Sequence, residues 1–178
     1  MKRFDLQDIF FIDRFSKEES HHDQEFRNYF EIIFIEAGVG IYHINDYAVP
    51  YKKGDVFLIA PNDTYHFKIQ EETQFCYFHF SELLFSNKVN LPDRSHWLHR
   101  IEHIISKPDL LPGDLIKESH DRNLIWHIHK GIFYEFEGQR EFYRHNISNM
   151  INTILSVLAR NINAVSYTHL TLPTILLV

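Results

Sequence analysis

Short apolar runs alternate with turn residues through the first half of the chain. They cover residues 30–36, 41–44, 47–49, 56–60, 67–69 and 75–80. The runs are rich in β-branched and aromatic residues, and glycine, proline, asparagine or aspartate lies between most of them, which is typical of β-strands joined by tight turns. Short strands at this regular spacing predict an antiparallel sandwich or barrel over about residues 4–85.

The clearest strand pair surrounds the Pro61-Asn62-Asp63 turn. Gly54 opens the apolar run before this turn, and His66 lies just after it. An apolar run bounded by turn residues is typical of a buried strand. We expect His66 to face the mouth of the barrel, where ligands are usually held.

Helical periodicity replaces the strand pattern after Phe85. A first helix is expected to begin near Asp93, a second begins near Asp121, and a third covers about residues 141–161. Apolar positions repeat at helical spacing in each of them. They are Trp97, Ile101, Ile104 and Ile105 in the first, Leu124, Ile125, Ile128 and Ile132 in the second, and Ile147, Met150, Ile151, Ile154, Leu155 and Leu158 in the third. The last stripe is the strongest periodic signal in the chain.

The apolar stripe of the third helix fits two arrangements. Its candidates for a dimer contact are Ile147, Ile151, Ile154 and Leu158. They would form a dimer helix if they met a second copy of the chain, and part of the core if the helix packed on its own barrel. The pattern alone favours neither arrangement, because both bury the same stripe.

The chain therefore divides into a mainly β half and a helical half, an α+β fold overall. We assign residues 1–88 to the barrel, residues 89–163 to a helical dimerisation or linker region, and residues 164–178 to a tail. The tail has no charged residue, contains Pro173, and has a threonine and leucine character that matches nothing before it. It resembles translated vector sequence, so we expect it to be non-native or disordered.

Composition narrows the possible functions. The 178 residues carry a formal net charge of −6, which argues against a nucleic-acid surface on this chain. With 44% hydrophobic residues, the chain can bury a real core and is not disordered. Cys76 is the only cysteine, and neither a secretion signal nor a membrane span is apparent. We therefore expect a cytoplasmic protein without disulfides and without membrane contact.

Three segments carry a resemblance to a known family. They are residues 31–40 (EIIFIEAGVG), 54–61 (GDVFLIAP) and 65–67 (YHF). These segments resemble the N-terminal sensing domain of AraC-type transcriptional regulators, over about residues 15–85 and more loosely to Ile162. The resemblance implies a cupin barrel, a double-stranded β-helix or jelly roll, that binds a small effector, often a sugar. It also implies dimerisation helices and a following DNA-binding domain of two helix-turn-helix units. We expect that domain to be missing, so the chain looks like a truncated regulator that would contact DNA only through the missing part.

The resemblance to cupins also brings in a metal. Metal-binding cupins place a His-x-His pair a few residues before a glutamate, with another histidine later. Glu31 fits the glutamate and His66 the later histidine, but Glu25 and Arg27 occupy the positions of the pair. Because an arginine repels a metal cation, we expect no metal site and no other cofactor.

The same resemblance suggests which side chains line a ligand pocket. In sugar-sensing members, one aromatic follows the histidine of the second motif and another lies on the last strand, and Phe67 and Tyr77 match these positions. Strand alternation places His79 on the same face as Tyr77. The expected ligand residues are Glu31, His66, Phe67, Tyr77 and His79. Each of them also fits an ordinary core role, and Ala37 stands where the family carries an arginine, so the ligand stays open.

The sequence gives no positive evidence of catalysis, and we expect a protein that is not an enzyme. Cys76 is expected to be buried and inert, and no nucleophile, phosphate-loop or dinucleotide motif is present. His96, His99 and His103 share one helix face by their spacing, which fits a solvated polar face. The alternatives are a small metal-dependent cupin enzyme, an isomerase or dioxygenase, and an interaction domain with a filled barrel.

Overall fold

The computed structural model describes residues 2–5, 9–19, 28–44, 47–61, 63–85, 116 and 118–168. For residues 2–5, 82, 85 and 162–168 only the backbone is described. The first expected helix, which begins near Asp93, lies outside the described residues, as do Glu25 and Arg27.

Among the described residues, eight strands come first and two long helices follow. The strands are β1 (Lys2–Asp5), β2 (Phe10–Lys17), β3 (Phe30–Ala37), β4 (Val39–Ile44), β5 (Tyr47–Lys52), β6 (Val56–Ile59), β7 (Tyr65–Ile69) and β8 (Thr73–Phe80). A short 3-10 helix η1 (Glu82–Phe85) ends the strand region, and the helices are α2 (Ser119–Gly138) and α3 (Tyr143–Thr168). The expected α+β order of a β half before a helical half is confirmed.

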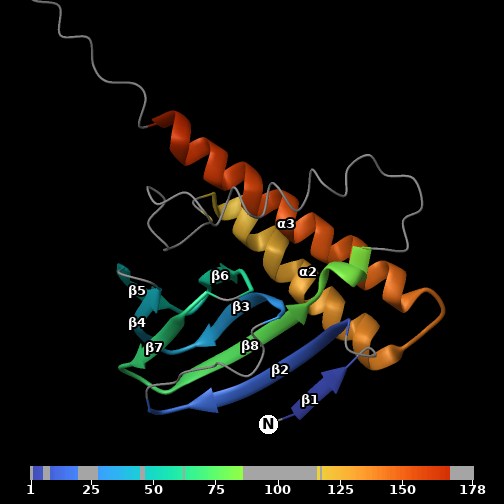
Figure 1. Cartoon of the computed structure of the whole chain (residues 1–178), viewed down its shortest axis with the longest axis horizontal. Coiled ribbons are helices and arrows are strands. Elements are labelled where there is room, and N and C mark those ends of the chain that lie inside the picture. Colours follow the sequence, from blue (N-terminus) through green and yellow to red (C-terminus); the bar gives the residue numbers. More distant parts are fainter. Residues whose placement is uncertain are drawn as a thin grey trace, which may run out of the picture.

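The strands form two antiparallel sheets that enclose a barrel interior. The larger sheet has the order β1-β2-β8-β3-β6 and the smaller one has the order β5-β4-β7. Helices α2 and α3 lie side by side along the larger sheet (Figure 1). The molecule is thus built from a smaller sheet, a larger sheet and a helical layer, and strands β3, β6 and β8 of the larger sheet are largely buried.

Aromatic and branched side chains fill the space between the two sheets. We call this group the inner core, and its buried members are Ile33, Ile35, Tyr42, Ile44, Tyr51, Phe57, Ile59, Tyr65, Phe67, Phe75 and Tyr77. On β3 and β8 these are alternate residues, because successive side chains of a strand point to opposite faces. Tyr77 and His79 of β8 lie on the same face, as strand alternation predicts.

The other face of the larger sheet packs against α2 and α3. We call this group the outer core; its sheet members include Ile32, Phe34, Cys76 and Phe78, and its helix members include Ile125, Ile132, Ile147, Ile151, Ile154 and Leu158. All four candidates for a dimer contact on α3 are completely buried within the single chain. This burial supports internal packing of α3, and a dimer contact through the same stripe stays a prediction.

Helix α3 continues to Thr168, past Asn163, where we placed the end of the helical region. Residues 169–178 lie outside the described part of the chain.

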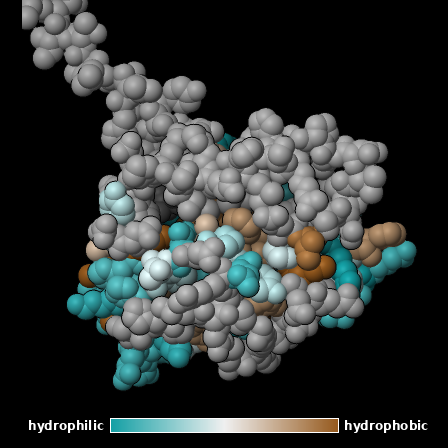
Figure 2. All heavy atoms as spheres, viewed as in Figure 1, coloured by the Kyte–Doolittle hydropathy of each residue, from teal (hydrophilic) through white to brown (hydrophobic). Residues whose placement is uncertain are grey.

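The coloured surface in Figure 2 is largely hydrophilic with smaller hydrophobic areas. Among the described helices, none combines the length and the hydropathy that a membrane crossing requires.

Gly54 forms the turn between β5 and β6 and joins the barrel to the helical layer. Its φ of +97° favours glycine, because residues with a Cβ rarely adopt this conformation. The Gly54 carbonyl oxygen accepts hydrogen bonds from Trp126 Nε1 at 3.0 Å and from an Arg122 nitrogen at 3.1 Å. Helix α2 is thereby fixed to the turn that opens the apolar run of β6.

Candidate functional site

Polar side chains gather at one end of the barrel interior. Glu31 is the second residue of β3, His79 is the last but one of β8, and Tyr65 is the first of β7. Glu31 and His79 lie opposite each other in the register of β3 and β8. Since neighbouring strands here are antiparallel, the start of one strand meets the end of the next, and these side chains converge.

Glu31 and His79 form the centre of this polar group, together with Asp13 of β2. Nδ1 of His79 lies 3.2 Å from a Glu31 carboxylate oxygen, and Nε2 lies 3.4 Å from Asp13 Oδ2. The Tyr65 hydroxyl donates a hydrogen bond of 2.6 Å to the other oxygen of Glu31. Asp13, Glu31 and His79 are all at most 5% exposed. We call Asp13, Glu31, Tyr65 and His79 the interior polar cluster.

The two carboxylates control the charge of His79. Burial by itself lowers the pKa of the imidazole, but contacts with Asp13 and Glu31 more than offset this, and the pKa of His79 is raised. The protonated imidazole then compensates part of the negative charge of two buried carboxylates. An unpaired buried charge is very costly, so these groups stabilise one another only as a set.

Aromatic rings surround the interior polar cluster. The Phe11 ring stacks on His79 with a centroid distance of 4.3 Å, and the Tyr77 ring stacks on it at 5.6 Å. Tyr42 packs near Tyr65 at 6.1 Å. Burial, aided by the charges of Asp63 and Glu31, raises the pKa of Tyr42 well above its usual range, so its hydroxyl stays protonated. The site thus combines flat apolar faces with a few fixed hydrogen-bonding groups, as ligand sites commonly do.

Most of the expected ligand residues are brought together here. Glu31 and His79 are in contact, Tyr77 stacks on His79, and Phe67 lies in the same inner core. Phe67 contacts Tyr65 with a ring distance of 5.9 Å, which links it to the cluster.

His66 lies elsewhere, and its expected orientation is corrected. Its neighbours Tyr65 and Phe67 are buried in the inner core, whereas His66 is only half-buried. Its ring stacks on His43 of the adjacent strand β4, with a centroid distance of 4.3 Å and an interplanar angle of 4°. Strand alternation requires this, because His66 and Phe67 are successive residues and cannot share a face.

Sequence reasoning missed Asp13 and Tyr65. Asp13 lies before the first of the apolar runs that predict strands, although Phe11, Asp13 and Phe15 alternate toward the interior. Tyr65 had a usable signal: it lies two residues before Phe67, and alternation places both on the same face.

The described barrel interior does not fit the metal site of metal-binding cupins. Each His79 ring nitrogen faces a carboxylate, so neither is directed toward a shared ion. Among the described residues, the group of potential ligands close enough to hold a metal lies outside the interior and consists of Glu36, Cys76 and His129. The interior polar cluster is thus better described as hydrogen-bonding groups than as metal ligands.

Comparison with known families agrees with this geometry. Residues 11–85 match the family model of the AraC-like ligand binding domain. This confirms the resemblance found in the sequence. We refer to residues 11–85 as the AraC-like barrel; all of the interior polar cluster lies within it.

Solved structures extend the likeness beyond the barrel. The AraC-like transcriptional activator CuxR is similar with a TM-score of 0.56 and 8% identity, over 88% of this chain and 52% of CuxR. EutQ of Clostridium difficile is similar with 18% identity and a TM-score of 0.39, over 45% of this chain and 65% of EutQ. A Cupin 2 conserved barrel domain protein of Salinispora arenicola is similar with 14% identity and a TM-score of 0.40, over 45% of this chain and 73% of that protein. The chain thus spans about half of CuxR and about two thirds of EutQ. No curated protein matches the chain.

Proposed function

We propose that this chain is the sensing part of an AraC-type transcriptional regulator and that it binds a small effector at the interior polar cluster. The observation that carries the proposal is the buried Asp13–His79–Glu31 arrangement inside the AraC-like barrel. A protein that needed only a stable barrel would gain little from it, because apolar side chains fill such a position at lower cost. Buried charged groups of this kind are a common sign of a functional site.

The chemistry of the cluster favours an effector rich in hydrogen-bond donors. The carboxylate oxygens of Asp13 and Glu31 are acceptors, and the tyrosine hydroxyls can both donate and accept. Hydroxyl groups of a sugar or an ammonium group can donate to these oxygens, and the apolar face of a sugar can stack on aromatic rings. A negatively charged sugar acid would be repelled, so neutral sugars and amines are the preferred class.

The larger sheet provides a physical link between such a ligand and the helices. Glu31 faces the interior from β3, while Phe34 of the same strand faces α2 in the outer core. A ligand that binds one arrangement of this sheet better than another shifts the balance between them by its difference in affinity. Helices α2 and α3 would pass that change to a DNA-binding part and to a second subunit of a homodimer, through surfaces other than the buried stripe of α3.

A thermal-shift screen with neutral sugars, amines and sugar acids tests this function. A ligand present at ~100 times its Kd stabilises the folded state by about 2.7 kcal/mol, which gives a clear rise in melting temperature. The Glu31→Gln variant should lose the response, and the Gln74→Ala variant, changed at an exposed position of β8, should keep it. A response that is equal in wild type and Glu31→Gln would contradict binding at the cluster.

The alternative is a small metal-dependent cupin enzyme. It requires a metal in the barrel that is lost when Glu31 is changed to Gln. A metal content that is unaffected by this change would exclude that alternative while leaving the sensing function open.

A further inference from the structure

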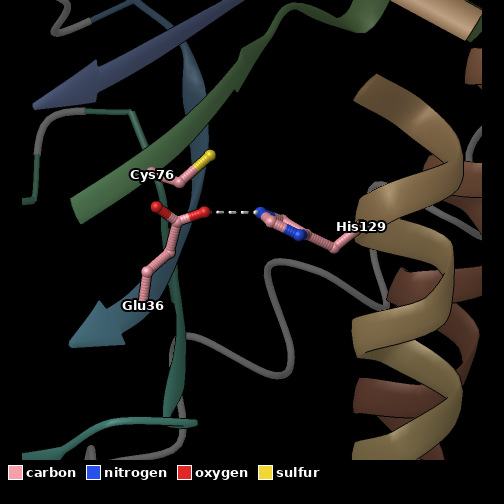
Figure 3. Close-up of side chains that lie close together, drawn as sticks. All are labelled: Glu36, Cys76 and His129. Carbon is pink, nitrogen blue, oxygen red and sulfur yellow. Dashed lines mark ion pairs between the residues drawn. The ribbon is translucent and has the colours of Figure 1, made fainter. Parts of the chain in front are cut away.

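A second group of chemically reactive side chains lies on the opposite face of the larger sheet. Glu36 on β3, Cys76 on β8 and His129 on α2 each offer one ligand atom, and these atoms all lie within 4.8 Å of one another. His129 Nε2 is 3.6 Å from Glu36 Oε1. Figure 3 shows the three side chains turned toward the same space between the sheet and α2.

The fold brings these three residues together from distant parts of the chain. Strand alternation turns Glu36 and Cys76 toward the helical layer, opposite to the inner core. The pairing of β3 with β8 is irregular between Ile35 and Ala37, so Glu36 lies at a β-bulge, a feature that often redirects a side chain near a functional site. His129 belongs to the buried stripe of α2, one helical turn after Ile125.

The surroundings of His129 indicate that one of its ring nitrogens serves a ligand. The residue is 4% exposed, and its ring packs against Phe34, Phe78 and Trp126 at centroid distances of 4.4, 5.3 and 5.0 Å. Within the described part of the chain, neither ring nitrogen has a hydrogen-bond partner. Buried polar groups are rarely left in this state, because each lost hydrogen bond is costly. Burial lowers the pKa of His129 to about 3, with the charges of Arg14 and Lys130 adding to the effect, so the ring is neutral, the form that binds metals.

We propose that Glu36, Cys76 and His129 bind one zinc ion between the AraC-like barrel and α2, with water as the fourth ligand. A thiolate, an imidazole and a carboxylate are the ligand types that zinc takes, and three protein ligands leave one open tetrahedral position. Bond lengths of about 2.0–2.3 Å place tetrahedral ligand atoms about 3.3–3.6 Å apart. The Glu36 and His129 ligand atoms already have this spacing. The other ligand atoms of the three residues need to approach one another by about 1 Å.

Arg14 orients the carboxylate of this zinc site. Its Nε donates a hydrogen bond of 2.6 Å to Glu36 Oε2, which leaves Oε1 facing His129. Metal-ligating carboxylates are commonly held by such partners. The Arg14 side chain is 57% exposed, so solvent screens its repulsion of the ion, and the carboxylate and thiolate attract it.

Zinc binding releases the thiol proton of Cys76. Burial holds the pKa of this thiol well above its usual range; the charge of Glu36 raises it further and Arg14 opposes the shift. Zinc binds the thiolate form of cysteine, so forming the zinc–sulfur bond displaces the thiol proton to solvent. This site is separate from the effector site, because Glu36 and Glu31 lie on opposite faces of β3, and the inference does not rest on the proposed function.

Cobalt and zinc titrations of the chelator-treated protein test the proposal. Wild type should bind one Co²⁺ with a thiolate-to-metal charge-transfer band, which Zn²⁺ abolishes by competition. Cys76→Ser should lose the band. His129→Phe, whose ring suits the aromatic surroundings, should bind the metal at least about 100-fold more weakly than wild type. The loss of a direct ligand weakens metal binding more than the loss of a residue that only holds a ligand in place. The control variant His127→Gln, changed at an exposed position of the same helix, should behave as wild type.

A second control separates this site from adventitious binding by the other histidines. The triple variant His96→Gln, His99→Gln and His103→Gln should keep both the band and the affinity. The absence of a thiolate band in wild type would overturn the proposal without any variant. Equal zinc affinity in wild type, Cys76→Ser and His129→Phe would also overturn it.

Discussion

The indole Nε1 of Trp126 donates a hydrogen bond of 3.0 Å to the carbonyl oxygen of Gly54, and it thereby connects α2 to the turn before β6. Arg122, one turn earlier on α2, donates to the same oxygen at 3.1 Å and lies 3.5 Å from an Asp55 carboxylate oxygen. The helical layer is thus attached to the AraC-like barrel by directed polar contacts as well as by the outer core. Such contacts fix the position of α2 more closely than apolar packing alone.

Replacing Trp126 with Phe should lower the free energy of unfolding by about 1 kcal/mol. Phe keeps an aromatic ring against Phe34 but cannot donate to Gly54, and a typical hydrogen bond contributes about this much. The effect stays small because Arg122 still donates to the same oxygen. Urea unfolding in the presence of chelator measures it, and Tyr134→Phe, at a 64% exposed position of the same helix, should change stability by less than about 0.5 kcal/mol. Equal losses in both variants would contradict a specific role for the Gly54 contact.

Much of this architecture could be predicted from local patterns. The shared face of Tyr77 and His79 on β8 follows from the period of two along a strand, and the α3 stripe follows from helical spacing. His66 departs from its prediction: its position after the turn predicts a ligand-facing side chain, but strand alternation places His66 and Phe67 on opposite faces. A face assignment from alternation is the stronger argument for strand residues.

The other missing elements depend on contacts between distant segments. Cys76 and Glu36 could be placed on one face of the sheet from the sequence, but nothing local connects them with His129, more than 50 residues later along the chain. Likewise, Asp13 reaches His79 only because β2 pairs with β8. Strand order and helix packing decide such encounters, and no periodicity within a segment reports them.

Protonation of His79 should make the protein more stable at mildly acidic than at alkaline pH. The charged groups beside its ring are Asp13 of β2 and Glu31 of β3, and the Tyr77 ring of β8 stacks on it. Tyr65 of β7 contacts Glu31 through its hydroxyl. The pKa of His79 is raised in the folded state. Its contribution to the free energy of unfolding is therefore complete below the pKa of the unfolded state, about 6.5, and is lost as pH rises through the pKa of the folded state. Each unit of difference between the two values corresponds to about 1.4 kcal/mol.

Unfolding free energies of wild type and His79→Gln across pH 5–9 check this dependence. The stability advantage of wild type should shrink as pH rises, since deprotonation leaves two buried carboxylates without a cationic partner. The exposed-site variant His127→Gln should follow the wild-type curve. A wild-type advantage that grows with pH would show that the ring is neutral in the folded protein.

Asp121 joins the start of α2 to the later part of α3 and should stabilise their packing. Arg160 donates to both of its carboxylate oxygens, and the Asn161 amide donates at 2.6 Å. Asp121→Ala should lower the free energy of unfolding by about 1.5 kcal/mol, near the lower limit for hydrogen bonds to a charged group. The lower limit applies because the Arg160 side chain is 56% exposed, and solvent weakens its attraction to the carboxylate. Chemical denaturation measures the change, and Glu141→Ala, in the exposed turn before α3, is the matched control.

The Asp121 contribution should also depend on pH. The hydrogen bond from Arg160, opposed by burial and aided by Asn161, lowers the pKa of Asp121. The stabilising effect of Asp121 is therefore complete above the pKa of the unfolded state, about 3.9, and is lost as pH falls through the pKa of the folded state. The difference between wild type and Asp121→Ala should narrow only below about pH 4. A difference that is constant down to acidic unfolding would mean that the carboxylate charge contributes nothing.

Leu158→Ala should destabilise the protein without changing its oligomeric state. Leu158 is completely buried in the outer core, and truncating a buried leucine costs about 2–5 kcal/mol through lost burial and the cavity that remains. Thr153→Ala, at an exposed position of the same helix, should cost less than about 0.5 kcal/mol. Light scattering and unfolding at several protein concentrations distinguish the alternatives, since an interface between two chains makes stability depend on concentration. If Leu158→Ala converted a dimer to a monomer of unchanged stability, α3 would be a dimer helix after all; a large loss at every concentration places its stripe in the core of one chain.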